Sequence, residues 1–122
     1  MQVLCYTGVI RYDDSNVGSA VKTFQVLSDG IIVFDLVSPP AKGWEYGTRL
    51  LGVAEQISPG EYKSPWIYLY DHLGKDMPEE YTPSARLVFR TSYPSSAEIN
   101  VEGTWEDSDG GTYTFNEILQ RV

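Results

Sequence analysis

The stretch Ala97–Trp105 reads AEINVEGTW, and small or apolar residues alternate with polar ones along almost all of it. Ile99 and Val101 fall on one side of this alternation, and Glu98 and Asn100 fall on the other. Because successive side chains of a β-strand point to opposite faces, the pattern predicts a strand with one buried face and one face in water. The same period of two recurs along the chain between turn residues, so we expect an all-β protein.

Eight runs of this kind are joined by short segments rich in Gly, Pro, Asp and Ser. They lie near Val3–Tyr12, Val21–Leu27, Ile31–Val37, Thr48–Gln56, Glu61–Tyr70, Ser84–Thr91, Ala97–Trp105 and Thr112–Gln120. The short connections favour an antiparallel meander over a Greek key. Closure of such a meander removes exposed sheet edges, and Gly8, Gly52 and Gly103 inside strands are positions where a barrel can bend.

We therefore predict one domain, residues 1–122, folded as an eight-stranded up-and-down β-barrel. A two-sheet β-sandwich with the same strand order is the alternative. The interior of an eight-stranded barrel is either filled by side chains or wide enough for one small ligand. The sequence does not decide between these two.

Two hairpin registers follow from the turns. A loop at Ser28–Gly30, with Gly30 in the left-handed conformation, places Phe24 opposite Phe34 and Val26 opposite Ile32. In the last hairpin, Trp105 faces Tyr113 and Gly103 faces Phe115, and a slip in the alternation after Glu117 indicates a bulge.

A third register is predicted from charge. A turn centred on Tyr93–Ser95 places Arg90 opposite Glu98 and Arg86 opposite Glu102. Opposite charges then meet on one face and apolar residues on the other, which specifies the pairing of the sixth and seventh runs.

The fifth run is apolar on both of its faces. Because alternate residues of a strand share a face, we expect one aromatic row and one aliphatic pair, the row being Tyr62, Trp66, Tyr68 and Tyr70 and the pair Ile67 and Leu69. The aromatic row either lines the barrel or forms an exposed patch of the kind found at protein interfaces.

Net charge limits the classes of partner. Seventeen acidic and nine basic residues give a formal net charge of −8, which disfavours nucleic acids and membrane surfaces. Cys5 is the single cysteine, so no internal disulfide is expected. The N-terminal residues lack the basic and long apolar regions of a signal peptide, and no apolar run reaches the roughly 18 residues of a membrane helix. We expect a cytoplasmic protein.

Motifs for catalysis and metal binding are missing from the sequence. His72 is the one histidine, and a turn position beside Asp71 fits an exposed residue better than a proton-transfer group. One His and one Cys cannot form a tetrahedral metal site, and the acidic loops lack the twelve-residue pattern that binds calcium. No glycine-rich phosphate loop opens onto a helix. We expect no metal, no cofactor and no catalytic residue, although the sequence leaves open whether any catalysis occurs.

One element resembles a known family. The pairing of Gly103-Thr104-Trp105 with Gly111, Tyr113 and Phe115 is similar to the Gly-x-Trp strands of the lipocalin and avidin barrels. The resemblance covers the last fifth of the chain. In those families the element lies near the N-terminus, whereas here it is in the penultimate strand, so the resemblance implies a calycin-like barrel shape and no binding residue.

The leading functional hypothesis is a non-catalytic barrel that binds a small hydrophobic or aromatic ligand in its interior or at its mouth. The predicted wall consists of aromatic residues, with Arg49 or His72 as polar orienting groups: Trp44, Trp66, Tyr68, Trp105, Tyr113 and Phe115. The alternative is a protein-interaction module, such as an adaptor, an immunity protein, an inhibitor or a homodimer, that uses the acidic surface and the aromatic row. The third is an enzyme of the cyclase or isomerase kind using Asp35, Glu55 and His72.

Overall fold

The computed structural model describes residues 3–13, 17–27, 30–42, 45–69, 84–91 and 97–122. These residues form strands and no helix, and accordingly none of them belongs to a helix that could span a membrane. The strands are β1 (Leu4–Arg11), β2 (Gly18–Val26), β3 (Ile31–Ser38), β4 (Thr48–Ser58), β5 (Glu61–Lys63), β6 (Ile67–Tyr68), β7 (Ser84–Thr91), β8 (Glu98–Asp107) and β9 (Thr112–Arg121).

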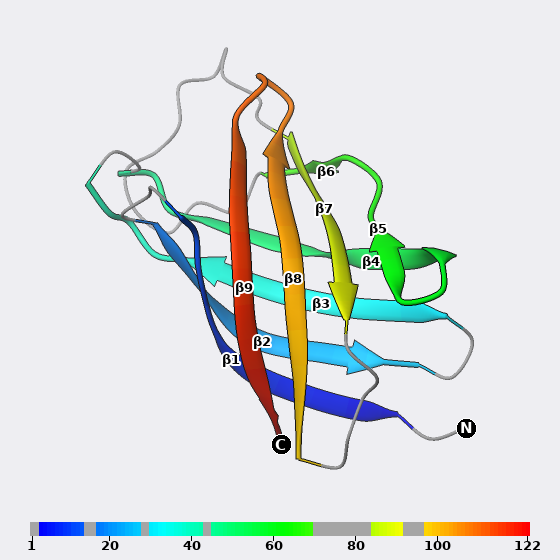
Figure 1. The fold of residues 1–122 in the computed structure, drawn as a ribbon. Helices are drawn as coiled ribbons and strands as arrows, with labels where there is room; N and C mark the ends of the chain where they lie inside the picture. Colours follow the sequence, from blue (N-terminus) through cyan, green and yellow to red (C-terminus); the bar gives the residue numbers. More distant parts are fainter. Residues whose placement is uncertain (1–2, 14–16, 28–29, 43–44, 70–83, 92–96) are drawn as a thin grey trace.

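The strands form a closed antiparallel barrel of the up-and-down type (Figure 1). Among the eight strands of the ring, those that follow one another in sequence pair, β1 pairs with β9, and the pairing of β5 with β7 completes the ring. In Figure 1 strands β7 to β9 run steeply across β1 to β4, so the two halves face each other. The predicted barrel is confirmed, and it is not the two-sheet alternative. Strand β6 is an additional short strand that pairs with β7 outside the ring.

The predicted fifth run is broken into β5 and β6, and the break changes which residues face the core. Lys63 pairs with Val88 and Ile67 pairs with Ala85, so four steps along one strand match three along the other. The extra residue forms a bulge, so each residue after it points to the face opposite to the one that unbroken alternation predicts. Tyr62 is therefore buried, whereas Trp66 and Tyr68 are 47% and 50% exposed. The prediction that these three rings share a face is wrong, and Tyr70 lies outside the described residues.

Two predicted registers are confirmed. Phe24 pairs with Phe34 and Val26 with Ile32, and Gly30 has the positive φ of 81° that its turn requires. In β8 and β9, Trp105 pairs with Tyr113 and Gly103 pairs with Phe115. The predicted bulge after Glu117 is wrong, because the register continues unshifted to the pairing of Glu98 with Gln120. The alternation slips in the sequence because Ile118 is an apolar residue at an outward position, 53% exposed.

The register predicted for the β7–β8 hairpin is wrong by four residues. Arg86 pairs with Glu106 and Arg90 with Glu102, where Glu102 and Glu98 were expected. Arginines and glutamates both repeat every four residues here, so a shift of four keeps every charge and every face matched. The predicted turn at residues 93–95 lies outside the described residues.

Gly103 lies at a close approach of β7 and β8 in the register that forms. A Cβ atom on Gly103 would lie 2.1 Å from the Val88 carbonyl oxygen and 2.5 Å from the Phe89 Cα. Only glycine allows β7 and β8 to approach this closely at that point. Gly52 has a similar role, because its missing side chain leaves room for Ile67 of β6, whose Cδ1 would lie 2.3 Å from such a Cβ.

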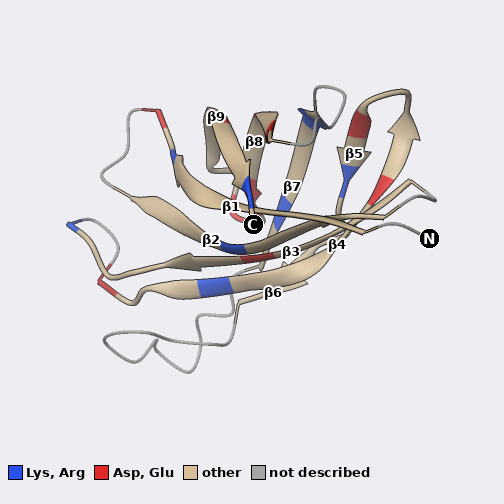
Figure 2. Cartoon of the chain, turned by 90° about the horizontal axis from the view of Figure 1, so that it is seen from below, with Lys and Arg blue, Asp and Glu red and all other residues tan. Residues whose placement is uncertain are grey.

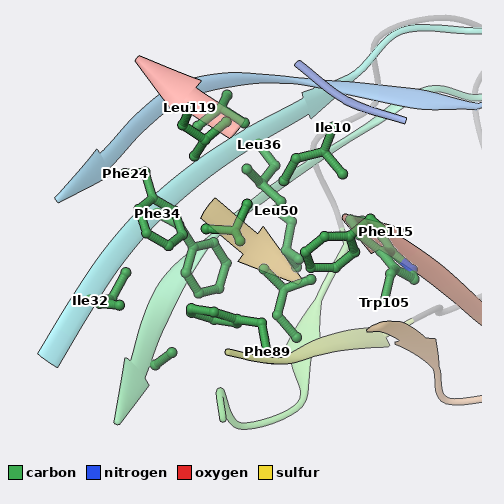
Figure 3. Close-up of a cluster of buried hydrophobic side chains, with 14 of the residues drawn as sticks. Ile10, Phe24, Ile32, Phe34, Leu36, Leu50, Phe89, Trp105, Phe115 and Leu119 are labelled. Atoms are coloured by element: carbon green, nitrogen blue, oxygen red, sulfur yellow. The ribbon is translucent and has the colours of Figure 1, made fainter. Parts of the chain in front are cut away.

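The barrel interior is filled by large side chains around the paired β5 and β7. Figure 3 shows Phe24, Phe34 and Phe89 pointing toward one another from different strands. The Phe89 ring lies 5.6 Å from the Phe24 ring and is stacked on Tyr62 at the same distance. Each fully buried side chain of this size stabilises the fold by about 1.5–3 kcal/mol. The same buried cluster continues to Tyr12, Trp105 and Phe115 at the opposite end of the barrel, where polar side chains join it.

Candidate functional site

A group of hydroxyl side chains occupies the opposite end of the barrel, where β1 and β3 end and β2 and β4 begin. We call it the Tyr12 end. The Tyr12 hydroxyl lies 2.7 Å from the Ser19 Oγ, which lies 2.7 Å from the Ser38 Oγ. All three residues are buried. They form one continuous chain of two hydrogen bonds inside the barrel.

Thr48 lies next to this group but makes no hydrogen bond to it. It stands opposite Ser38 in the β3–β4 pairing and is 1% exposed. Side chains directly opposite each other in an antiparallel pair have Cβ atoms about 4.5–5.5 Å apart, so the two hydroxyls are neighbours. The Thr48 Oγ1 nevertheless has no hydrogen-bond partner. Buried polar groups in native proteins are nearly always partnered, which makes this atom the most informative one in the site.

The alternation of the strands explains why these hydroxyls point inward. The inward positions of β3 are apolar at Ile32, Phe34 and Leu36 and become polar at Ser38. On β4, inward Leu50 is followed toward the strand start by Thr48. Each strand thus changes from apolar to polar at the same end of the barrel, and the hydroxyls gather there.

Aromatic rings enclose the phenol of this chain. Trp105 and Phe115 contact Tyr12 edge-on, with ring centroids 5.7 and 5.9 Å from its own. Figure 3 shows Trp105 and Phe115 next to each other at one side of the buried cluster. The Trp105 indole N–H donates to Asp107 Oδ1 at 2.6 Å, which fixes the orientation of the ring.

The electrostatics of this end favour neutral groups. Burial raises the pKa of Tyr12 far above that of a free phenol, although the hydrogen bond to Ser19 opposes the shift, so the phenol keeps its proton at neutral pH. Burial also raises the pKa of Asp107, against the effect of the Trp105 hydrogen bond. No Lys or Arg occurs among the buried residues that the structure describes.

The structure separates the residues predicted to line a ligand site. Trp105 and Phe115 are buried at the Tyr12 end, and Tyr113, opposite Trp105, is 37% exposed at its rim. Trp66 and Tyr68 lie on the outer surface because of the bulge before β6, so they do not line the interior. Trp44 and His72 lie outside the described residues.

Arg49 is held on the outer surface by an ion pair with Asp35. The guanidinium donates to both carboxylate oxygens, with Nε to Oδ1 at 2.9 Å and the terminal nitrogen to Oδ2 at 2.8 Å. Figure 2 shows the corresponding basic and acidic bands side by side on β4 and β3. Arg49 therefore lies on the outward side of β4, opposite to the side of buried Thr48 and Leu50. Asp35 and Glu55 share the outward face, so these two acids do not meet in the interior as the enzyme hypothesis expects.

Sequence reasoning missed Tyr12, Ser19, Ser38 and Thr48. The available signal was a polar residue at an inward position near the end of a predicted strand. Hydroxyl residues are also common in turns, so this signal becomes specific only after the barrel is closed and the four positions are known to converge.

The exposed aromatic residues form a second feature, on the outside of the barrel. The Arg86 guanidinium lies over the Trp66 ring, 4.3 Å from its centroid, and pairs with Glu106 at 3.0 Å. Ile67 points toward the inner face of β4 at Gly52, whereas Trp66 and Tyr68 project from β6 on the opposite side, and Leu51 and Val53 project from the outer face of the neighbouring strand β4. We call this group the outer patch; its members are Leu51, Val53, Trp66 and Tyr68.

Within the described ranges, no group of three or more His, Cys, Asp or Glu side chains is placed to hold a metal ion. Comparison of the chain with models of known protein families and with curated protein sequences found no match.

Proposed function

We propose that the protein binds a small, mostly apolar ligand at the Tyr12 end of the barrel. The observation that carries this proposal is the buried Thr48 hydroxyl, which has no partner and lies beside the Ser38 hydroxyl. An unsatisfied buried hydroxyl costs about 1–3 kcal/mol, and a ligand atom that accepts its hydrogen bond recovers that energy. Ligand sites in proteins combine apolar and aromatic walls with a few converging polar groups, which is the composition found here.

The position of the polar groups supports one direction of entry. Phe24, Phe34 and Phe89 pack against one another toward β5, away from the hydroxyl chain. The half around Trp105 and Phe115 carries the polar groups. A ligand that places its apolar body against these two rings reaches the hydroxyls with its polar end.

The test is binding of the neutral fluorescent probe N-phenyl-1-naphthylamine, with the contact residues mapped from amide chemical shifts. The proposal expects shifts at Tyr12, Ser19, Ser38 and Thr48. A Trp66→Ala variant serves as the matched control, because it removes an aromatic ring from the outer surface and should leave probe binding unchanged. Absence of binding, or shifts confined to the outer patch, would refute the proposal.

Native mass spectrometry of the gently purified protein provides an independent measurement. A monomer that carries a few hundred daltons of additional mass would support the proposal and provide the compound for identification. A bare dimer would instead favour the second candidate function.

The outer patch supports that second candidate, a protein-interaction module. Trp66 and Tyr68 project from the same side of β6 and are 47% and 50% exposed, and large exposed aromatic side chains of this kind are common at interfaces. The stacked Arg86 adds a residue type that is enriched at binding hot spots. Light scattering of the wild type and of Trp66→Ala tests self-association: loss of a dimer in the variant would support it, and a monomer in both would remove the homodimer.

A further inference from the structure

We infer that the ligand presents a neutral carbonyl oxygen to the hydroxyls of Ser38 and Thr48. The inference depends on the proposed function, because it names the chemical class that the Tyr12 end would recognise. It is derived from the number of hydrogen atoms that these side chains can donate.

The hydroxyl chain has one proton more than its hydrogen bonds use. Tyr12, Ser19 and Ser38 each carry one hydroxyl proton, and two hydrogen bonds join them. Each bond uses one proton, so one of the three protons has no acceptor within the chain. Thr48 supplies another, since its hydroxyl has no partner at all. The site therefore has two donor protons in excess.

The direction of the chain decides where the first excess proton lies. If Tyr12 donates to Ser19 and Ser19 donates to Ser38, the free proton is on Ser38, directly opposite Thr48. A carbonyl oxygen has two lone pairs and can accept from both hydroxyls at once. Binding of a carbonyl group selects this direction, and the chain then strengthens the last donor through cooperativity.

The charges around the site favour a neutral acceptor over a carboxylate. The buried residues that the structure describes include no Lys or Arg, so an anion would be desolvated without a counter-charge. The Asp107 carboxylate, held by Trp105 at the same end, would repel it. A ketone, aldehyde, ester or amide oxygen avoids both costs.

The test is competition of three small probes of matched shape against N-phenyl-1-naphthylamine: acetophenone, ethylbenzene and benzoate. Acetophenone differs from ethylbenzene by a carbonyl in place of a methylene, and benzoate carries a full charge. Wild type is expected to bind acetophenone at least about fivefold more tightly than ethylbenzene, from two hydrogen bonds of ordinary net strength. Benzoate is expected to bind more weakly than acetophenone.

Variants identify the hydroxyls responsible. Thr48→Val and Ser38→Ala should each lower the acetophenone preference about 2- to 10-fold while ethylbenzene binding is kept. Tyr12→Phe removes one proton and one hydrogen bond together, so the serine pair keeps a free proton and the preference should fall by less. Thr7→Val is the control, because Thr7 donates to the Val21 carbonyl away from the hydroxyl chain.

The outcomes separate this inference from the proposed function. Equal binding of acetophenone and ethylbenzene would overturn the carbonyl inference and leave the ligand site intact; it would also be the result if a trapped water already satisfied the hydroxyls. Tighter binding of benzoate would overturn the requirement for a neutral ligand. Failure of the naphthylamine and all three probes to bind would overturn the proposed function itself.

Discussion

Replacing Thr48 by valine is expected to stabilise the ligand-free protein, although most substitutions of buried residues destabilise. The Thr48 hydroxyl is 1% exposed and without a partner, so in the folded state it loses its hydrogen bonds to water and gains none. Valine has nearly the same shape and removes that polar atom. The penalty for a buried unsatisfied hydroxyl is about 1–3 kcal/mol, and relief of it should raise the free energy of unfolding by that amount.

The size of the effect is within reach of ordinary unfolding experiments. For a domain of this length, 1 kcal/mol corresponds to a change in Tm of about 4 °C. Urea and thermal unfolding of ligand-free protein, its bare mass checked by native mass spectrometry, measure the difference directly. An unchanged urea m-value would show that the denatured state is unaffected.

Thr7→Val is the matched control for this measurement. The Thr7 hydroxyl donates to the Val21 carbonyl oxygen at 2.7 Å, so the same chemical change there removes a hydrogen bond. It should lower the free energy of unfolding by about 0.5–1.5 kcal/mol. If Thr48→Val destabilised the protein as Thr7→Val does, the Thr48 hydroxyl would be satisfied in solution, and the argument for a ligand acceptor would fail.

Three further predictions concern other parts of the barrel. Gly103→Ala should destabilise by about 1–3 kcal/mol or more in urea unfolding, because its Cβ would lie 2.1 Å from the Val88 carbonyl oxygen; a loss below about 1 kcal/mol would contradict the close approach. Burial raises the pKa of Asp107 above 3.8, so the folded state binds that proton more tightly and stability falls as pH rises through this range. Asp107→Asn removes this dependence, and its stability relative to wild type should increase from pH 3 to pH 7; a difference that does not vary with pH would count against it. Trp66→Ala should leave the free energy of unfolding within about 1 kcal/mol of wild type, because the ring is 47% exposed, and a larger loss would show that the outer patch is part of the core.

The closed barrel was predictable because it depends on local patterns that recur in every strand. Alternation fixed the inward faces of β3 and β8, and the turn at Gly30 set the pairing of Phe24 with Phe34. The β7–β8 register was not predictable from charge, because Arg and Glu repeat with the same spacing and two registers satisfy them equally. In the register that forms, β7 and β8 approach each other closely at Gly103, where a side chain would not fit.

Two of the residues that the sequence suggested for a ligand site, Trp105 and Phe115, lie at the Tyr12 end, and their role in binding stays a prediction. The prediction that Trp66 and Tyr68 share a face with Tyr62 was wrong, because one extra residue between Lys63 and Ile67 reverses the facing of the residues that follow. When both faces of a strand are apolar, the alternation of its residues does not reveal where a bulge occurs.

The sequence by itself determined the class of fold, most strand boundaries and two of the three predicted hairpin registers, because these depend on side-chain alternation and turn residues close together in the chain. The tertiary structure alone decided that hydroxyls from three strands and the end of a fourth converge. Tyr12, Ser19, Ser38 and Thr48 are far apart in sequence, and each alone looks like an ordinary residue near a strand end. Barrel closure brings them together, and burial leaves the Thr48 hydroxyl without a partner, which is the observation behind the proposed ligand site.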